Sequence, residues 1–69
     1  MKPGDLRRFR DDLVTLSDER NYGGFVFMVL KVVNVLPDGP RLVDILLDGR
    51  IEREWGHHWV KDNSEAIDV

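Results

Sequence analysis

The chain has 69 residues with 10 basic and 13 acidic side chains, which gives a net charge of −3, and it contains no cysteine. A chain this short forms a single domain, 1–69, with a small core and no room for a second domain. The lack of cysteine excludes disulfides, thiolate metal sites and cysteine nucleophiles, and the acidic balance should on average repel nucleic acid and anionic membranes.

The chain is predicted to start with a Pro-Gly turn and a short strand anchored by Leu6 and Phe9, whose odd spacing predicts a bulge or an early bend. Residues 10–24 are crowded with charges. Their β-branched residues favour a long loop over a helix. We expect Leu13 or Leu16 to reach into the core from this loop.

Residues 25–36, FVFMVLKVVNVL, form the longest predicted strand, and both of its faces are mostly apolar. One face carries Phe25, Phe27, Val29, Val33 and Val35, and the other carries Val26, Met28, Leu30, Val32 and Leu36. A strand that bends sharply can place both faces in the core of a small barrel. The alternative is that part of the second face is exposed and docks on a partner.

A turn at 37–40, Pro-Asp-Gly-Pro, leads into a hairpin over 42–55 with Asp48-Gly49 at its tip. A two-residue loop would pair Leu47 with Arg50 and bring charged side chains to the core face. A three-residue loop with a glycine bulge would pair Leu46 with Arg50. Because a slip of one residue moves every side chain to the other face, burial favours the bulged loop.

In this bulged register the core face of the hairpin would be almost entirely apolar. It would carry Val43, Ile45, Ile51, Arg53 and Trp55. The charged member, Arg53, is the one exception to an apolar core face.

After Trp55 we predict one 3₁₀ turn over 56–59 and a short last strand at Val60 and Lys61. Residues 62–69 are expected to be either a tail or an added edge strand. The predicted fold class is therefore all-β, a small five-stranded barrel with a short 3₁₀ turn before the last strand.

The longest apolar run, 25–30, is far shorter than the roughly 20 residues that cross a bilayer. No charged leader followed by a long apolar run opens the chain. We therefore expect a soluble chain that is not secreted and does not bind membranes.

The order of these elements, from Gly4 to about Lys61, resembles the Src-homology-3-like small barrels. More narrowly, MKPGDL at 1–6 together with DGRIE at 48–52 resembles short barrel proteins encoded by tailed bacteriophages, including cyanophages and marine phages. The resemblance implies a virion or assembly component, located in the virion or in the cytoplasm of an infected bacterial host. The Ala-Leu-Tyr-Asp-Tyr stretch of members that bind proline-rich peptides has no counterpart here, so a polyproline groove is not expected.

Residues that could carry catalysis or bind metal are few. His57 and His58 are adjacent, point apart in most conformations and lack a third ligand at a recognisable spacing. Asp44, Glu52 and Glu54 lie close together in the hairpin and could form an acid pair, but charged residues at alternate strand positions are typical of a solvated face. We therefore expect no enzyme, no cofactor and no metal site.

The large apolar side chains outnumber what one small core can hide, which predicts a contact surface with another protein or a second copy of the chain. Trp55 is expected to fill the core. The predicted protein-interface residues are Met28, Leu30, Leu42, Leu46 and Trp59.

The alternative function is nucleic-acid binding, as in small barrels of the Tudor and KOW types. It would use the N-terminal basic patch Lys2, Arg7, Arg8 and Arg10. The aspartates interleaved with these residues should cancel most of the attraction for phosphate, so nucleic acid is not the expected partner.

Overall fold

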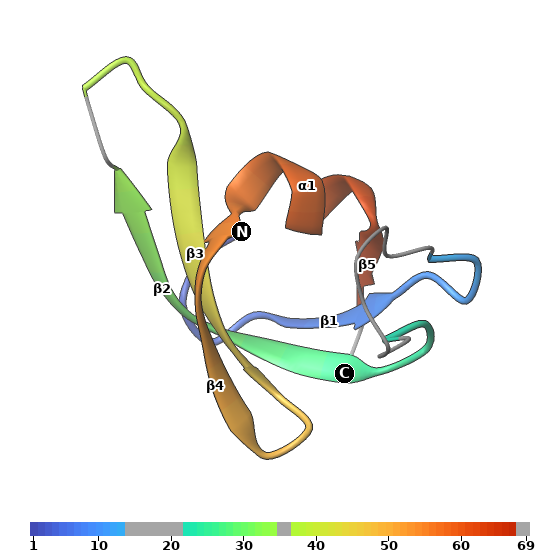
Figure 1. Ribbon diagram of the computed structural model, residues 1–69. Coiled ribbons are helices and arrows are strands. Elements are labelled where there is room, and N and C mark those ends of the chain that lie inside the picture. Colours follow the sequence, from blue (N-terminus) through green and yellow to red (C-terminus); the bar gives the residue numbers. More distant parts are fainter. Residues whose placement is uncertain (14–21, 35–36, 68–69) are drawn as a thin grey trace.

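The computed structural model describes residues 1–13, 22–34 and 37–67, and the predictions for Leu16, Val35 and Leu36 lie outside this part of the chain. The elements are β1 (Leu6–Phe9), β2 (Val26–Asn34), β3 (Arg41–Leu47), β4 (Arg50–Gly56), α1 (His57–Asp62) and β5 (Ser64–Ala66). The strands form one antiparallel sheet in the order β4-β3-β2-β1-β5 (Figure 1).

The sheet curls around a small core, and α1 lies inside the curl (Figure 1). The fully buried side chains come from β1, β2, β3 and α1. They are Phe9, Phe27, Val29, Val43, Ile45, Leu47 and Val60. Leu13 is also buried, so the expectation that this residue or Leu16 reaches the core is met by Leu13.

The all-β expectation is confirmed in its coarse form, because the described chain is mostly antiparallel strand. The expected barrel, however, is not closed. Among the described residues no pairing joins β4 to β5, which are the two ends of the sheet. In a strand as short as β1 the expected bulge is also not found, and Leu6 and Phe9 simply point to opposite faces.

Strand β2 carries a bulge that the sequence analysis did not place. Its register against β3 shifts between Val29 and Lys31. Phe27 and Val29 face the core as predicted, but beyond the bulge Val32, rather than Val33, packs against the core, opposite Val43. The predicted face assignment is therefore wrong beyond Leu30, because one extra residue reverses the alternation.

The hairpin register predicted from burial is wrong. Leu47 pairs with Arg50 across a two-residue loop, and Leu46 pairs with Ile51. Asp48 and Gly49 have φ values of 53° and 74°. Two consecutive positive φ angles characterise the type I′ turn, whose twist matches that of the flanking strands, so the turn geometry, and not the burial of Ile51, determines the register.

A second bulge, in β4, returns Trp55 to the core face, where the predicted register had also placed it. The register shifts between Val43 and Ile45, and Trp55 comes to lie opposite Val43. At the bulge Glu54 has a φ of 62°, and its backbone N–H donates to Oδ1 of Asp44 over 2.9 Å. The bulge thus lies in the strand and not in the turn.

The segment after β4 also differs from the prediction. The expected 3₁₀ turn and the expected strand at Val60 and Lys61 are both part of the α-helix α1. Val60 is fully buried, which draws this segment onto the core, and the backbone N–H of Asn63 donates to the carbonyl of Trp59 at the helix end. The last strand is β5, which pairs with β1.

Within the described part of the chain, no helix is both long and apolar enough to span a bilayer.

The positive φ of Glu54 leads to a stability prediction. A residue with a Cβ is strained in this conformation, whereas glycine is not. We expect Glu54→Gly to stabilise the fold by roughly 0.5–1 kcal/mol, and Glu52→Gly, in ordinary strand backbone, to destabilise it by roughly 0.5–1 kcal/mol. Urea unfolding of both variants measures the difference, and equal losses of stability in the two would contradict the bulge.

Candidate functional site

The outer face of the sheet, opposite the core, carries apolar side chains on β1, β2, β3 and β4 and directly after β5. Phe27 and Leu47 are buried in the core, so their chain neighbours Met28 and Leu46 point to the outer face. Met28 is 37% exposed and Leu46 is 38% exposed. These two side chains lie directly opposite each other, on β2 and β3.

The cross-strand pairing extends these two residues into a continuous row. Leu6 pairs with Met28, and Leu46 pairs with Ile51, which is 54% exposed. At the other end the backbone N–H of Ile67 donates to the carbonyl of Leu6 over 3.1 Å. We call Ile67, Leu6, Met28, Leu46 and Ile51 the outer row. It crosses the whole sheet, from the end of β5 to β4.

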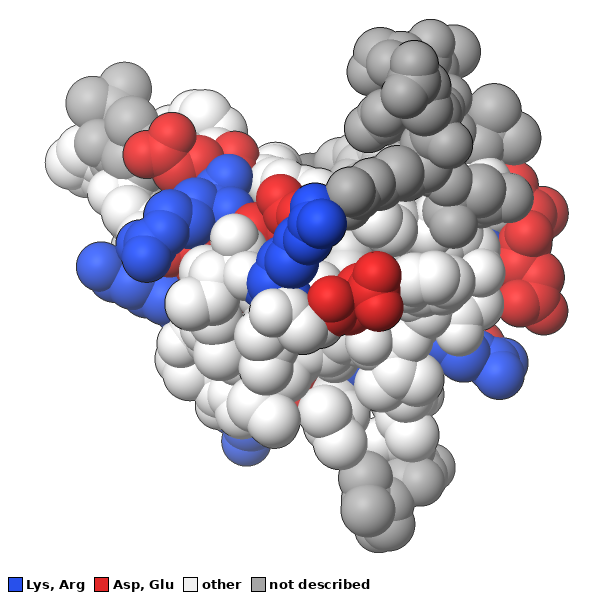
Figure 2. Space-filling model, turned by 60° about the horizontal axis from the view of Figure 1, so that its bottom comes forward, with Lys and Arg blue, Asp and Glu red and all other residues white. Residues whose placement is uncertain are grey.

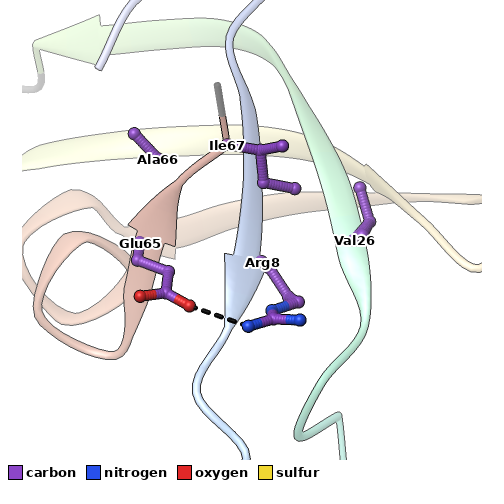
Figure 3. A pocket seen from close by; sticks show the side chains of 5 residues that line it. All are labelled: Arg8, Val26, Glu65, Ala66 and Ile67. Carbon is purple, nitrogen blue, oxygen red and sulfur yellow. Dashed lines mark hydrogen bonds and ion pairs between the residues drawn. The ribbon is translucent and has the colours of Figure 1, made fainter. Parts of the chain in front are cut away.

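A second line of residues runs beside the outer row, on the side nearer the hairpin tip. It contains Val26, which is 51% exposed, and Arg8, which lies opposite Val26 on β1. A guanidinium nitrogen of Arg8 lies 3.0 Å from a carboxylate oxygen of Glu65 (Figure 3). The opposite charges of Arg8 and Glu65 balance each other in this exposed ion pair. Val26 and Ile67 form the apolar part of the surface beside it.

Two shallow hollows indent this face. One, of about 450 Å³, is lined by Arg8, Val26, Glu65, Ala66 and Ile67, which come from three adjacent strands and the residue after β5 (Figure 3). The other, of about 360 Å³, is lined by Leu6, Val26, Phe27, Met28, Leu46, Asp48 and Gly49. Val26 separates the two hollows, and their linings are largely apolar.

The space-filling view shows a broad uncharged area in its lower half, with basic and acidic groups at both sides (Figure 2). An antiparallel sheet that faces water on one side normally has polar residues on that side. The outer row departs from this rule on β1, β2, β3 and β4, and at Ile67 directly after β5.

The predicted interface residues do not form one surface. Met28 and Leu46 lie together in the outer row. Leu30 is half-buried at the β2 bulge. Leu42 is half-buried near the start of β3, far from the hairpin tip, and it pairs with Gly56.

Trp59 lies on the core side of the sheet and not with Met28 and Leu46. Its ring centroid is 6.1 Å from that of Phe9 and 6.0 Å from that of Trp55. It is 40% exposed. Trp59 therefore forms the rim of the aromatic core, and Trp55, as expected, packs against that core.

Sequence analysis missed four residues of this face: Leu6, Val26, Ile51 and Ile67. Ile51 was assigned to the core because the wrong hairpin register was preferred, and the two-residue loop would have placed it opposite Leu46. Leu6 was named with Phe9 as an anchor of the first strand, and their odd spacing was explained by a bulge or bend, whereas in the regular strand β1 it puts them on opposite faces.

The N-terminal basic residues do not gather into one free patch. Arg7 donates to the side-chain and backbone oxygens of Ser64, over 2.8 and 3.0 Å. Arg8 forms an ion pair with Glu65, and the Nε of Arg10 lies 3.3 Å from Oδ1 of Asp12. Arg7 and Arg8 also point to opposite faces of β1. This arrangement gives no support to the alternative of nucleic-acid binding.

The two histidines have different environments. His58 lies on α1 with its Nε2 2.9 Å from a carboxylate oxygen of Asp62. The Nε2 of His57 is buried and has no hydrogen-bond partner among the described residues. Burial lowers the pKa of His57, and the positive charges of the N-terminal amino group, Arg41, Lys61 and Arg7 lower it further. These effects disfavour protonation of His57 in the folded chain. Separately, the described residues include no cluster of three metal-binding side chains.

The carboxylates of the hairpin have structural surroundings. Asp44 accepts the backbone N–H of Glu54 and so holds the β4 bulge. Glu54 is exposed, and it lines a hollow of about 260 Å³ together with Asp44, Lys31, Val33, Leu42 and Arg53. The expectation that this group carries no catalysis stays a prediction.

The lowered pKa of His57 makes stability depend on pH. The unfolded chain binds a proton near the ordinary value of 6.5, whereas the folded chain resists it, so protonation favours unfolding. We expect the melting temperature to fall as pH decreases from about 7.5 to about 5.5, and His57→Gln to reduce this fall. His58→Gln is the matched control, and its melting temperature should fall with decreasing pH as much as that of the wild-type chain. A His57→Gln profile that parallels the wild-type profile would contradict the assignment.

Comparison of the chain with protein-family models, with curated proteins and with solved structures finds no match. The site is therefore interpreted from its own geometry.

Proposed function

We propose that this chain is a non-enzymatic protein-interaction module that binds another polypeptide through the outer row. The observation that carries this proposal is the register that aligns one apolar side chain from each of β1 to β4, and Ile67 after β5, on the face opposite the core. Met28, Leu46 and Ile51 at the centre and one end of this row are all exposed.

Burial of this row would provide the main driving force for association. Each square ångström of apolar surface removed from water contributes about 25 cal/mol. The hollows on this face are shallow and open, which suits a protein surface better than a small ligand, because small ligands bind in concave sites that enclose them. Contiguous exposed apolar patches of this kind mark interaction sites in soluble proteins.

We further propose that the curled sheet is of the Src-homology-3-like type, and that the chain is a phage-encoded virion or assembly component. The strand order β4-β3-β2-β1-β5 and the short helix before the last strand are compatible with this type of fold. The phage origin, and with it a location in the virion or in the infected host cell, rests on the resemblance of 1–6 and 48–52 to phage barrels.

Photo-crosslinking in the native cell tests the proposed interaction. A benzophenone amino acid replaces Met28 in the centre of the outer row, and in a second chain it replaces Lys61, which is exposed on α1. We expect Met28 to yield one dominant protein adduct, identified by mass spectrometry, because the bound polypeptide would cover it.

The Lys61 position is the control and should give weak, heterogeneous adducts. If Met28 gives no more protein adduct than Lys61 in cells that contain the native partners, the outer row is not an interaction surface. Adducts with nucleic acid at Met28 would instead favour the alternative function.

A further inference from the structure

The outer row has the same order of residue types when it is read from either end. From β5 to β4 it is Ile67, Leu6, Met28, Leu46 and Ile51, so two leucines flank a central methionine and two isoleucines end the row. An interface between two identical chains related by a two-fold axis must be complementary to itself. A row that is symmetric about its centre meets this requirement.

The line of residues beside the outer row carries opposite charges on the two sides of Val26. This line begins with Glu65 on β5, Arg8 on β1 and Val26 on β2, and Arg8 lies directly opposite both of the others. Asp48 follows Leu47 at the hairpin tip and lines the same hollow as Val26. Arg8 and Asp48 therefore lie on opposite sides of Val26, one basic and one acidic.

We propose that the partner of the outer row is a second copy of this chain, packed face to face about a two-fold axis that runs along β2. This axis places Met28 against Met28 and Val26 against Val26 of the second copy. Leu6 then meets Leu46, and Ile67 meets Ile51. Arg8 meets Asp48 of the second copy, and the symmetry makes this contact twice.

The dimensions of the molecule allow such a dimer. Stable interfaces bury about 800 Å² per partner, roughly a sixth of the 5078 Å² of accessible surface. The molecule measures 33 × 31 × 20 Å, so its broad faces are large enough. Two sheets that pack face to face align their strands within about 30°, which this axis permits because it leaves the two β2 strands nearly parallel.

Electrostatics favour this orientation over others. Arg8 already pairs with Glu65 in its own chain, and in the dimer it would lie between Glu65 and Asp48 of the second copy. Charge pairs across an interface select the orientation and exclude wrong partners. This dimer rests on the proposed function, since both invoke the outer row as a contact surface.

Charge exchange tests the orientation. Sedimentation equilibrium of the purified chain from about 10 µM to about 1 mM should show twice the chain mass of 8.0 kDa at high concentration. Arg8→Asp and Asp48→Arg each place like charges together twice, so each alone should weaken dimerisation by about tenfold or more. An equimolar mixture of the two variants should recover it, because both contacts become attractive in the mixed dimer.

Two further variants separate dimerisation from folding. Met28→Glu places two carboxylates at the axis and should give a monomer with an unchanged circular dichroism spectrum, because Met28 lies outside the core. Lys61→Glu, on α1, should leave the dimer unchanged.

A wild-type chain that stays monomeric at about 1 mM, or a mixture of the charge variants that fails to restore association, would overturn the proposed dimer. The photo-crosslinking result distinguishes the two failures. An adduct between Met28 and a different protein would refute the second copy and retain the proposed function, whereas no protein adduct would refute both.

Discussion

The structure depends on the register of the β3–β4 hairpin, which two backbone features determine together. The positive φ angles of Asp48 and Gly49 close a two-residue turn, and the bulge at Glu54 corrects the alternation two residues before β4 ends. The carboxylate of Asp44 accepts the N–H of Glu54 at this bulge. Without the bulge, Trp55 would lie on the outer face, and the core would lose one of its largest side chains.

This register divides the apolar residues between two faces. Near the tip, the two-residue turn sends Leu47 to the core and Leu46 with Ile51 to the outer face. Beyond the bulge, Val43 and Trp55 face the core together. The same sheet thus supplies one face of a core, closed by Phe9 and α1, and an apolar face that no described element covers.

The combination explains how so short a chain can form a core and still expose an apolar face. Its aromatic core is compact, with the rings of Phe9 and Phe27 4.5 Å apart and Trp55 and Trp59 around Phe9. Met28, Leu46 and Ile51 of the outer row are among the large apolar side chains that remain exposed outside this interior. Because the charges beside the row are of both signs, with Arg8 paired to Glu65 and Asp48 on the other side of Val26, the surface presents apolar area without a strong field of one sign.

The sequence by itself determined the local features of this protein. The first four strands, the turn at 37–40, the Asp48-Gly49 hairpin, and the core positions Phe27, Val29, Val43 and Ile45 follow from alternation and turn chemistry, which involve neighbouring residues. Met28 and Leu46 were also recognised as outward-facing. What only the tertiary structure decided is how these elements align: the two-residue turn, the bulges at Leu30 and Glu54, and the conversion of 57–62 into a helix over the core. These features depend on hydrogen bonds and packing between residues far apart in the chain, and a shift of a single residue reverses a face, so local patterns could not specify the outer row.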